Sequence, residues 1–422
     1  MKSLVQKFLA WLPQLDHRIW ILMAGRLLSQ IGTGFILFYS AIFFVNQVGL
    51  SATLVGIGIG SQSVSGVVGR IVGGSMADSP RWGRRQTLLI SAAISAISDV
   101  VLTFSDSFPI FLLGNLLMGL GIGLYWPATE ATVADLTLPD QRNEAYALTR
   151  LADTLGVGLG VVFGGWLIAA TGMYRLLFVL DGISFLVFFG IIYWAIAETL
   201  QPRQTEGTVL QGWATALSDR PLMVYVPINI LFTTYLALIN SALPLYFSNF
   251  VSDQTPNQGF SATQLSILFT WYVGLSALCQ LPVVRYLRRF SHPQALMLSA
   301  LIWGVGFLLI WVTGNASNGQ LAWAGLGLAV MALATVAYTP SASSLVVMLA
   351  PDALRGVYLS ISSLCWAAGY FIGPTIGGWA MDQSRRLADG FWILAALSIA
   401  IAIGILQYLE RLLQTKQFDS DR

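Results

Sequence analysis

Charged residues are scarce in this chain of 422 residues. Asp, Glu, Lys and Arg make up 10% of it and hydrophobic residues 56%, whereas a typical soluble domain is about 25% charged. A soluble surface cannot be built from so few charges. The composition therefore excludes a soluble globular protein and predicts an integral, multi-pass protein of the lipid bilayer, an inner (plasma) membrane if the source is bacterial.

Histidine and cysteine are also rare, which limits the possible chemistry. His17 and His292 lie at the edges of apolar runs, and Cys279 and Cys365 lie inside them. We therefore expect no disulfide framework, no histidine-based metal site and no catalytic triad. The sequence also lacks the phosphate-binding pattern G-x-x-x-x-G-K, so we do not expect ATP to drive this protein. Together these absences predict that it is not an enzyme and uses neither a metal nor a cofactor.

Apolar runs long enough to cross a bilayer occur twelve times. A spanning helix needs about 20 such residues, because its backbone polar groups must be satisfied within the membrane. The longest polar stretch, 198–220, is predicted to link an N-terminal six-helix half (1–197) to a C-terminal six-helix half (221–422). The predicted spans are 19–46, 52–77, 86–105, 109–134, 145–170 and 176–196, then 221–248, 262–284, 293–313, 319–349, 356–381 and 391–409.

Lys and Arg are distributed unevenly between the two ends of these spans. If both termini are cytoplasmic, 17 of the 22 basic residues lie on or beside the cytoplasmic face, and Arg26 and Arg70 lie inside spans. The opposite face has only Arg175, Arg385 and Arg386. Because Lys and Arg are retained on the cytoplasmic side, this asymmetry predicts cytoplasmic termini.

The two predicted halves repeat one another. Tyr125-Trp-Pro recurs as Tyr338-Thr-Pro, the segment 160–166 recurs as 373–379, and 86–94 resembles 294–302. Several recurrences in the same order and at nearly one offset indicate an internal duplication. We therefore predict an all-α membrane protein with parallel repeats of six helices.

Two motifs give the chain a family resemblance. The segment Gly74-Ser-Met-Ala-Asp78-Ser-Pro-Arg-Trp-Gly83-Arg84-Arg85 is similar to G-x-x-x-D-x-x-G-R-R, with two extra residues. A second pattern, G-P-x-x-G-G, is complete at Gly373, Pro374, Gly377 and Gly378, and it is matched at Gly160, Gly164 and Gly165 except that Val161 replaces proline. On these residues the chain resembles the major facilitator superfamily, and within it the twelve-helix drug:proton antiporter group.

The resemblance implies roles for both motifs. It implies that Gly74, Asp78, Gly83, Arg84 and Arg85 form a cytoplasmic latch between the halves, with Asp78 facing Arg84, Arg85 or the segment 352–356. The alternative is a basic anchor without a moving part. The glycines are expected to let helices at the interface between halves approach closely. One position departs from the antiporter group, because Asn115 stands where an arginine assigned to proton coupling is usual.

Charges inside spans are costly and are candidates for function. Arg26, Arg70, Glu130 and Asp153 lie at similar depth, so they are expected to neutralise one another, either in proton coupling or as a structural cluster. Asp99 and Asp181 have no arginine at their depth. They are weaker candidates for carrying a proton, and the alternative is hydrogen bonding between helices.

The resemblance further implies a central cavity lined mainly by the first, fourth, seventh and tenth spans. Polar and aromatic residues there suit amphipathic substrates, although each can instead serve in helix packing. The candidates are Asn115, Tyr125, Trp126, Asn229, Asn240 and Tyr338.

These features predict a monomeric secondary transporter of small molecules that works by alternating access. Proton-coupled efflux of amphipathic or drug-like compounds is the favoured activity, with protons as the coupling ion and no nucleic-acid partner. Facilitated or coupled uptake of a small solute is the alternative, because Asn115 and Val161 depart from the antiporter pattern. A membrane sensor or scaffold that transports nothing is a third possibility.

Overall fold

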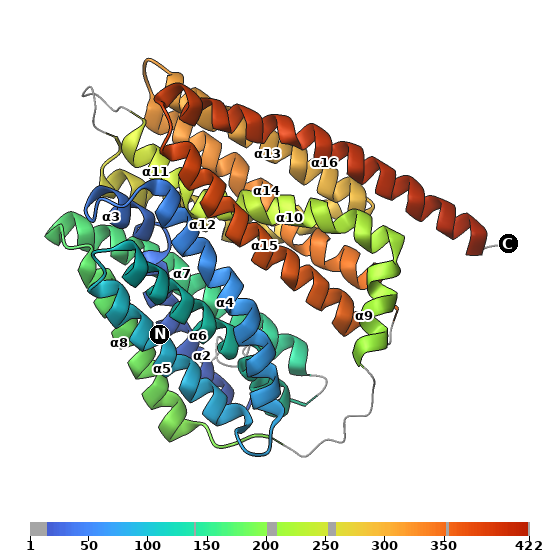
Figure 1. Cartoon of the computed structure of the whole chain (residues 1–422). Helices are drawn as coiled ribbons and strands as arrows, with labels where there is room; N and C mark the ends of the chain where they lie inside the picture. Colours follow the sequence, from blue (N-terminus) through green and yellow to red (C-terminus); the bar gives the residue numbers. More distant parts are fainter. Residues whose placement is uncertain (1–14, 139–140, 201–208, 252–258, 352–353, 421–422) are drawn as a thin grey trace, which may run out of the picture. The chain divides into compact units, whose positions relative to one another are not determined.

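The computed structural model describes residues 15–138, 141–200, 209–251, 259–351 and 354–420 (Figure 1). Within these ranges, twelve helical stretches are long and apolar enough to cross a membrane. The predicted all-α membrane fold is thereby confirmed. Asp352, which belongs to the segment 352–356 expected to face Asp78, lies outside the described residues, as do Pro139 and Asp140.

The spans agree with the predicted runs to within a few residues at most ends. The main exception is α16, which begins before the predicted start of the last span (391) and continues well past its predicted end (409). The linker also contains a short helix, α9 (Val209–Ser218). The remaining helices are α2 (His17–Leu37), α3 (Ser40–Asn46), α4 (Ala52–Asp78), α5 (Gly83–Thr103), α6 (Phe108–Asp135), α7 (Arg142–Thr171), α8 (Arg175–Ala195), α10 (Arg220–Asn240), α11 (Ala242–Asn249), α12 (Ala262–Leu287), α13 (His292–Asn315), α14 (Gln320–Leu349), α15 (Arg355–Met381) and α16 (Arg385–Ser420).

Several helix starts are explained by local capping. Asp16 precedes α2, and its Oδ1 accepts a hydrogen bond from the backbone N of Arg18 at 2.8 Å. The Arg18 side chain also bonds this carboxylate and lowers the pKa of Asp16 to about 2. α12 and α13 each begin with a reciprocal capping box, formed by Ser261 with Gln264 and by Ser291 with Gln294. Such caps satisfy backbone N–H groups that have no partner within the helix.

The first span of each half is broken at the same place. α2 gives way to α3 just as α10 gives way to α11, and the two short helices end at Asn46 and Asn249. The second members of the two pairs, α3 and α11, pack against one another. The duplication seen in the sequence therefore extends to an irregularity of the backbone.

The repeat also preserves a hydrogen bond between helices. Ser91 and Ser299 occupy the same position in the repeated segments 86–94 and 294–302. The Ser91 hydroxyl donates to the Gly121 carbonyl at 2.8 Å, and the Ser299 hydroxyl donates to the Ala334 carbonyl at 2.8 Å. In both halves the third span thus bonds to the fourth, α5 to α6 and α13 to α14.

Contacts divide the chain into two compact units. Unit 1 comprises Met1–Ile36, Ser65–Phe163 and Met173–Gln204, and unit 2 comprises Leu37–Val64, Gly164–Gly172 and Thr205–Arg422. Unit 2 therefore contains α3, the first half of α4 and the end of α7 together with the second-half helices. The boundaries of the two units therefore differ from those of the two predicted six-helix halves. The division into halves stays a prediction from the sequence repeat.

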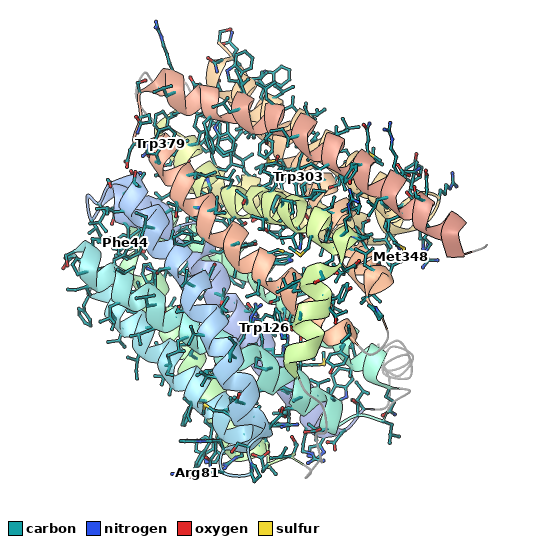
Figure 2. All side chains as sticks on the ribbon, turned by 45° about the vertical axis from the view of Figure 1, so that its right-hand side comes forward. Phe44, Arg81, Trp126, Trp303, Met348 and Trp379 are labelled. Carbon is teal, nitrogen blue, oxygen red and sulfur yellow. The ribbon has the colours of Figure 1, made fainter. Side chains whose placement is uncertain are left out.

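Unit 2 encloses an aromatic core. Trp303 is fully buried there (Figure 2), and its ring lies 5.3 Å from that of Phe232 and 5.4 Å from that of Tyr338. Trp379, by contrast, is exposed and labelled at the edge of the same view. An exposed aromatic of this kind suits the lipid-facing surface of a membrane helix.

Candidate functional site

A buried ion pair joins the first and fifth spans in unit 1. Both ends of the Arg26 guanidinium contact Asp153: its Nε donates to Oδ1 at 3.0 Å and its Nη2 donates to Oδ2. Arg26 is only 2% exposed. A paired geometry of this kind is the form in which a buried arginine is tolerated, because an isolated charge would be strongly disfavoured in low dielectric.

Two aromatic rings complete the surroundings of Arg26. Its guanidinium carbon lies 5.6 Å from the centre of the Tyr125 ring and 5.5 Å from that of Trp126, both on α6. These distances allow cation–π attraction, which is stronger where water is excluded. Arg26 is therefore held by one carboxylate and two aromatic side chains.

Glu130 and Arg70 belong to the same electrostatic neighbourhood. Glu130 is close enough to interact with both Arg26 and Arg70, and both Glu130 and Arg70 are exposed. The structure thus brings together all four residues of the predicted charge cluster, with Arg26–Asp153 as its buried part and Arg70–Glu130 as its accessible part.

A cavity of about 170 Å³ lies beside this cluster within unit 1. Tyr125 and Trp126, which face Arg26, also form part of its wall. Its surface is mostly aromatic and aliphatic, with several hydroxyl groups, as expected for a site that holds a partly apolar molecule. The lining residues are Ser29, Gln30, Thr33, Ser91, Ala92, Ser95, Ile122, Tyr125, Trp126, Phe185 and Phe188.

The second half carries an uncharged version of the ion-pair site. Asn229 lies 11 residues before the end of α10, as Arg26 lies 11 residues before the end of α2. Asn229 meets Tyr338, the repeat counterpart of Tyr125: the Tyr338 hydroxyl donates to Asn229 Oδ1 at 2.5 Å. Trp366 stands at the position equivalent to Asp153, seven residues before the repeated glycine. The two repeats therefore have polar or aromatic residues at equivalent positions, but those of the second repeat are uncharged.

Other predicted cavity residues are engaged in packing. Asn229 and Tyr338 are fully buried, and Asn229 also bonds Tyr225 and Ser362. Asn115 is 1% exposed and donates to the Phe111 carbonyl one turn earlier on its own helix. Asn240 Nδ2 lies 3.5 Å from the Tyr370 hydroxyl. None of these four is among the residues that line the cavity in unit 1.

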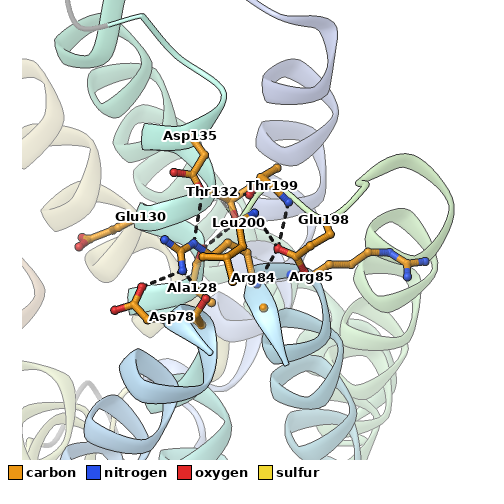
Figure 3. A network of polar contacts seen from close by, with 12 residues as sticks. Asp78, Arg84, Arg85, Ala128, Glu130, Thr132, Asp135, Glu198, Thr199 and Leu200 are labelled. Carbon is orange, nitrogen blue, oxygen red and sulfur yellow. Dashed lines mark hydrogen bonds and ion pairs between the residues drawn. The ribbon is translucent and has the colours of Figure 1, made fainter. Parts of the chain in front are cut away.

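The predicted latch is centred on Arg84 (Figure 3). Its Nη1 donates to Asp78 Oδ1 at 2.7 Å and to the Ala77 carbonyl, and its Nε donates to Asp135 Oδ2 at 3.2 Å. Arg84 thus ties the ends of α4 and α6 to the start of α5. Of the partners proposed for Asp78, the structure shows Arg84, while the Asp78 side chain remains 77% exposed.

Glu198 completes the same network from the start of the linker (Figure 3). Its carboxylate accepts from the backbone N of Arg84 at 3.0 Å and of Arg85 at 3.1 Å, at the beginning of α5. Gly83 is required here for two reasons. It has φ +70°, and a Cβ at this position would lie 2.2 Å from a Glu198 oxygen.

Asp135 and Glu198 are functional candidates that the sequence did not reveal. Each is an acid at the end of a span, where it is indistinguishable from an ordinary solvated residue. Arg85 extends the network, since its Nη2 donates to the Tyr193 carbonyl at 2.6 Å. Gly74 has free space around its Cβ position, so nothing in the structure explains why a glycine stands there.

Asp99 and Asp181 lie together inside unit 1. They are 1% and 0% exposed and close enough to interact electrostatically. Three of their four carboxylate oxygens have no hydrogen-bond partner among the described residues, and the fourth faces the Ser184 hydroxyl at 3.3 Å. A buried pair of acids without a counter-charge is unfavourable when ionised.

The predicted interface glycines serve two kinds of contact. Gly165 and Gly378 face helices from the other predicted half, Ser266 of α12 and Ala52 of α4, both within unit 2. Gly160, Gly373 and Gly377 instead face the first span of their own half. Gly164 is buried, and the Pro374 carbonyl faces Gly56 of α4.

Twelve spans in two repeated sets, with a buried charge cluster in one set, are typical of a membrane transporter. A family model described as Major Facilitator Superfamily matches residues 22–254 and 247–417. The chain belongs to this superfamily, as the motifs predicted, and its members are transporters and not enzymes.

Relatives with full-length similarity are also transporters. The chain is 25% identical to the multidrug resistance protein MdtH of Yersinia enterocolitica, over 92% of this chain and 93% of that protein. It is 24% identical to the uncharacterised MFS-type transporter YttB of Bacillus subtilis, over 94% and 96% of the two chains.

Solved structures share the fold. The nucleoside transporter NupG superposes with a TM-score of 0.79 at 14% identity, covering 93% of this chain and 99% of that one. A D-xylose–proton symporter gives 0.67 at 20% identity, covering 90% and 96%.

Proposed function

We propose that this transporter exports amphipathic small molecules by alternating access, driven by protons. The main support is the contrast between the two repeats. The Arg26–Asp153 pair in the first repeat is replaced by neutral Asn229 and Trp366 in the second. Retaining buried charges on one side of a duplication is costly, which favours a functional role for them.

Proton coupling can arise because protons and arginine side chains compete for the same carboxylates of the charge cluster. Asp153 is bonded to Arg26, and Glu130 interacts with both arginines. A carboxylate that loses its arginine partner when access to water changes also changes its affinity for a proton. Asp153 and Glu130 are therefore the favoured coupling groups.

The cavity beside Arg26 supports an amphipathic substrate. Tyr125, Trp126, Phe185 and Phe188 offer aromatic faces, and the serines and threonine offer a few hydrogen bonds. The similarity to a multidrug resistance protein over nearly the whole chain favours the same substrate class and export.

Transport of ethidium, a lipophilic fluorescent cation, tests this proposal in two settings. Cells that overproduce the protein should accumulate less ethidium than cells that overproduce Asp153→Asn at equal abundance. In proteoliposomes, an imposed pH gradient should accelerate ethidium movement by the parent and not by Asp153→Asn. Higher cellular accumulation in the parent would indicate uptake, and flux that ignores the pH gradient would indicate facilitated diffusion.

Uptake of a small solute is the second candidate. It is favoured by Asn115, which is buried and bonded within its own helix where the antiporter group has a coupling arginine. Parent protein that moves no compound of a broad panel in either direction would favour the sensor or scaffold.

A further inference from the structure

The start of α4 is held by a residue more than 300 positions away. Asp382, directly after α15, accepts from the backbone N of Ala52 through Oδ1 and from that of Thr53 through Oδ2, both at 2.7 Å. The Thr53 hydroxyl also donates to Oδ2. Both segments belong to unit 2.

These bonds complete the first turn of α4. The first four N–H groups of a helix have no partner farther back in the helix. Here Leu54 N donates to the Ser51 hydroxyl at 3.3 Å and Val55 N to the Ser51 carbonyl at 3.0 Å. Ala52 N and Thr53 N are left, and Asp382 accepts from both. A carboxylate is favoured at this end of a helix dipole.

The equivalent helix of the second half is capped differently. α12 begins with Ser261-Ala-Thr-Gln264, and α4 begins with Ser51-Ala-Thr-Leu54. In α12, Gln264 and Ser261 form a capping box from local residues. Leu54 has no polar side chain and cannot form this box. Part of the cap of α4 therefore comes from Asp382, directly after α15.

The backbones of α4 and α15 approach closely beside this cap. A Cβ on Gly378 would lie 2.1 Å from the Ala52 carbonyl, one on Gly56 would lie 2.0 Å from the Pro374 carbonyl, and one on Gly60 would lie 2.8 Å from the Phe371 carbonyl. The contact therefore depends on two glycines of α4, Gly56 and Gly60, and one of α15, Gly378.

We propose that Asp382 is a positioning residue of the transport cycle. Its carboxylate holds the α4 start against α15 while this end of the protein is closed, and releases it when this end opens. Asp78 at the other end of α4 is bonded to Arg84 within unit 1, so each end of one helix carries an acid-dependent contact. This inference rests on the proposed alternating access.

Cysteine labelling of purified protein in nanodiscs tests the proposal. The reporter is Val55→Cys, 2% exposed and one turn into α4, in a background with Cys279→Ser and Cys365→Ala. Asp382→Ala should increase the rate of maleimide labelling about tenfold, as expected for loss of charge-assisted hydrogen bonds. Asp382→Asn keeps one acceptor oxygen and should give an intermediate rate.

The matched control separates positioning from simple capping. Leu54→Gln combined with Asp382→Ala gives α4 the local capping box of α12. It should recover thermal stability while labelling stays fast. Parental labelling rates in Asp382→Ala, or in this double variant, would overturn the proposal. Labelling needs no substrate, so an absence of ethidium flux would count against the proposed function alone.

Discussion

Asn46 and Asn249, which occupy equivalent positions in the two repeats, form hydrogen bonds with one another. The Asn46 amide donates to Asn249 Oδ1 at 2.8 Å, and the Asn249 amide donates to Asn46 Oδ1 at 2.9 Å. Each is the last residue of the short helix that follows a broken first span. A contact in which equivalent groups exchange equivalent bonds is the arrangement expected at a two-fold axis. The pseudo-symmetry of the chain therefore reaches individual side chains within unit 2.

The latch should control alternation more than folding. Asp78→Ala removes one of the Arg84 partners and leaves Asp135 in place, so we expect normal membrane insertion and loss of most flux. Arg84→Ala should likewise insert normally into the membrane and lose most flux. Arg81→Ala is the control, since Arg81 is exposed beside Trp82. Flux by Asp78→Ala equal to that of the parent at equal abundance would contradict a latch.

Gly83→Ala should destabilise the protein by about 2 kcal/mol, because alanine is strained at positive φ and its Cβ would meet Glu198. Gly49 has φ +81° and no neighbour within 4 Å, so Gly49→Ala should show the strain alone. Gly74→Ala should be neutral. Thermal unfolding in detergent measures all three, and equal losses at Gly83 and Gly49 would exclude a steric role for Glu198.

The Arg26–Asp153 pair should show strong coupling in stability. Removing either partner leaves a buried charge, so Arg26→Ala and Asp153→Asn should each cost about 3 kcal/mol. The double variant should lose less than the sum of the two. Unfolding free energies from a double-mutant cycle check this, and simple additivity would show that the pair does not interact energetically.

Asp99 and Asp181 should tolerate neutral replacement. Because three of their oxygens have no hydrogen-bond partner among the described residues, Asp99→Asn and Asp181→Asn should leave thermal stability unchanged or raise it. If instead they carry the transported proton, both variants should fold normally and lose acceleration by a pH gradient. A large loss of stability would mean that the native acids make favourable interactions.

The sequence was sufficient to predict the twelve spans, the repeat and the grouping of Arg26 with Asp153. Those features depend on composition, periodicity and depth in the membrane, which are local properties. The acceptors Asp135, Glu198 and Asp382 could not be predicted in the same way. Each acts on a helix start or an arginine far away in sequence, and its role depends on which ends are brought together by folding.

The surroundings of the predicted cavity residues could not be inferred from the sequence repeat. Tyr125 and Trp126 line the cavity in unit 1, whereas the similar pattern at Tyr338 is buried in an aromatic cluster. Duplicated motifs have the same backbone position but different neighbours, because Asn229 and Trp366 replace the charges of the first half. Sequence repetition predicted where these side chains lie and not what surrounds them.

The composition of unit 2 changes how the linker is to be understood. Segments 37–64 and 164–172 come from the first half and pack with the second, held by the Asn46–Asn249 and Thr53–Asp382 bonds among others. The two predicted halves are therefore joined twice, once covalently through the linker and once by noncovalent contacts among segments that share unit 2.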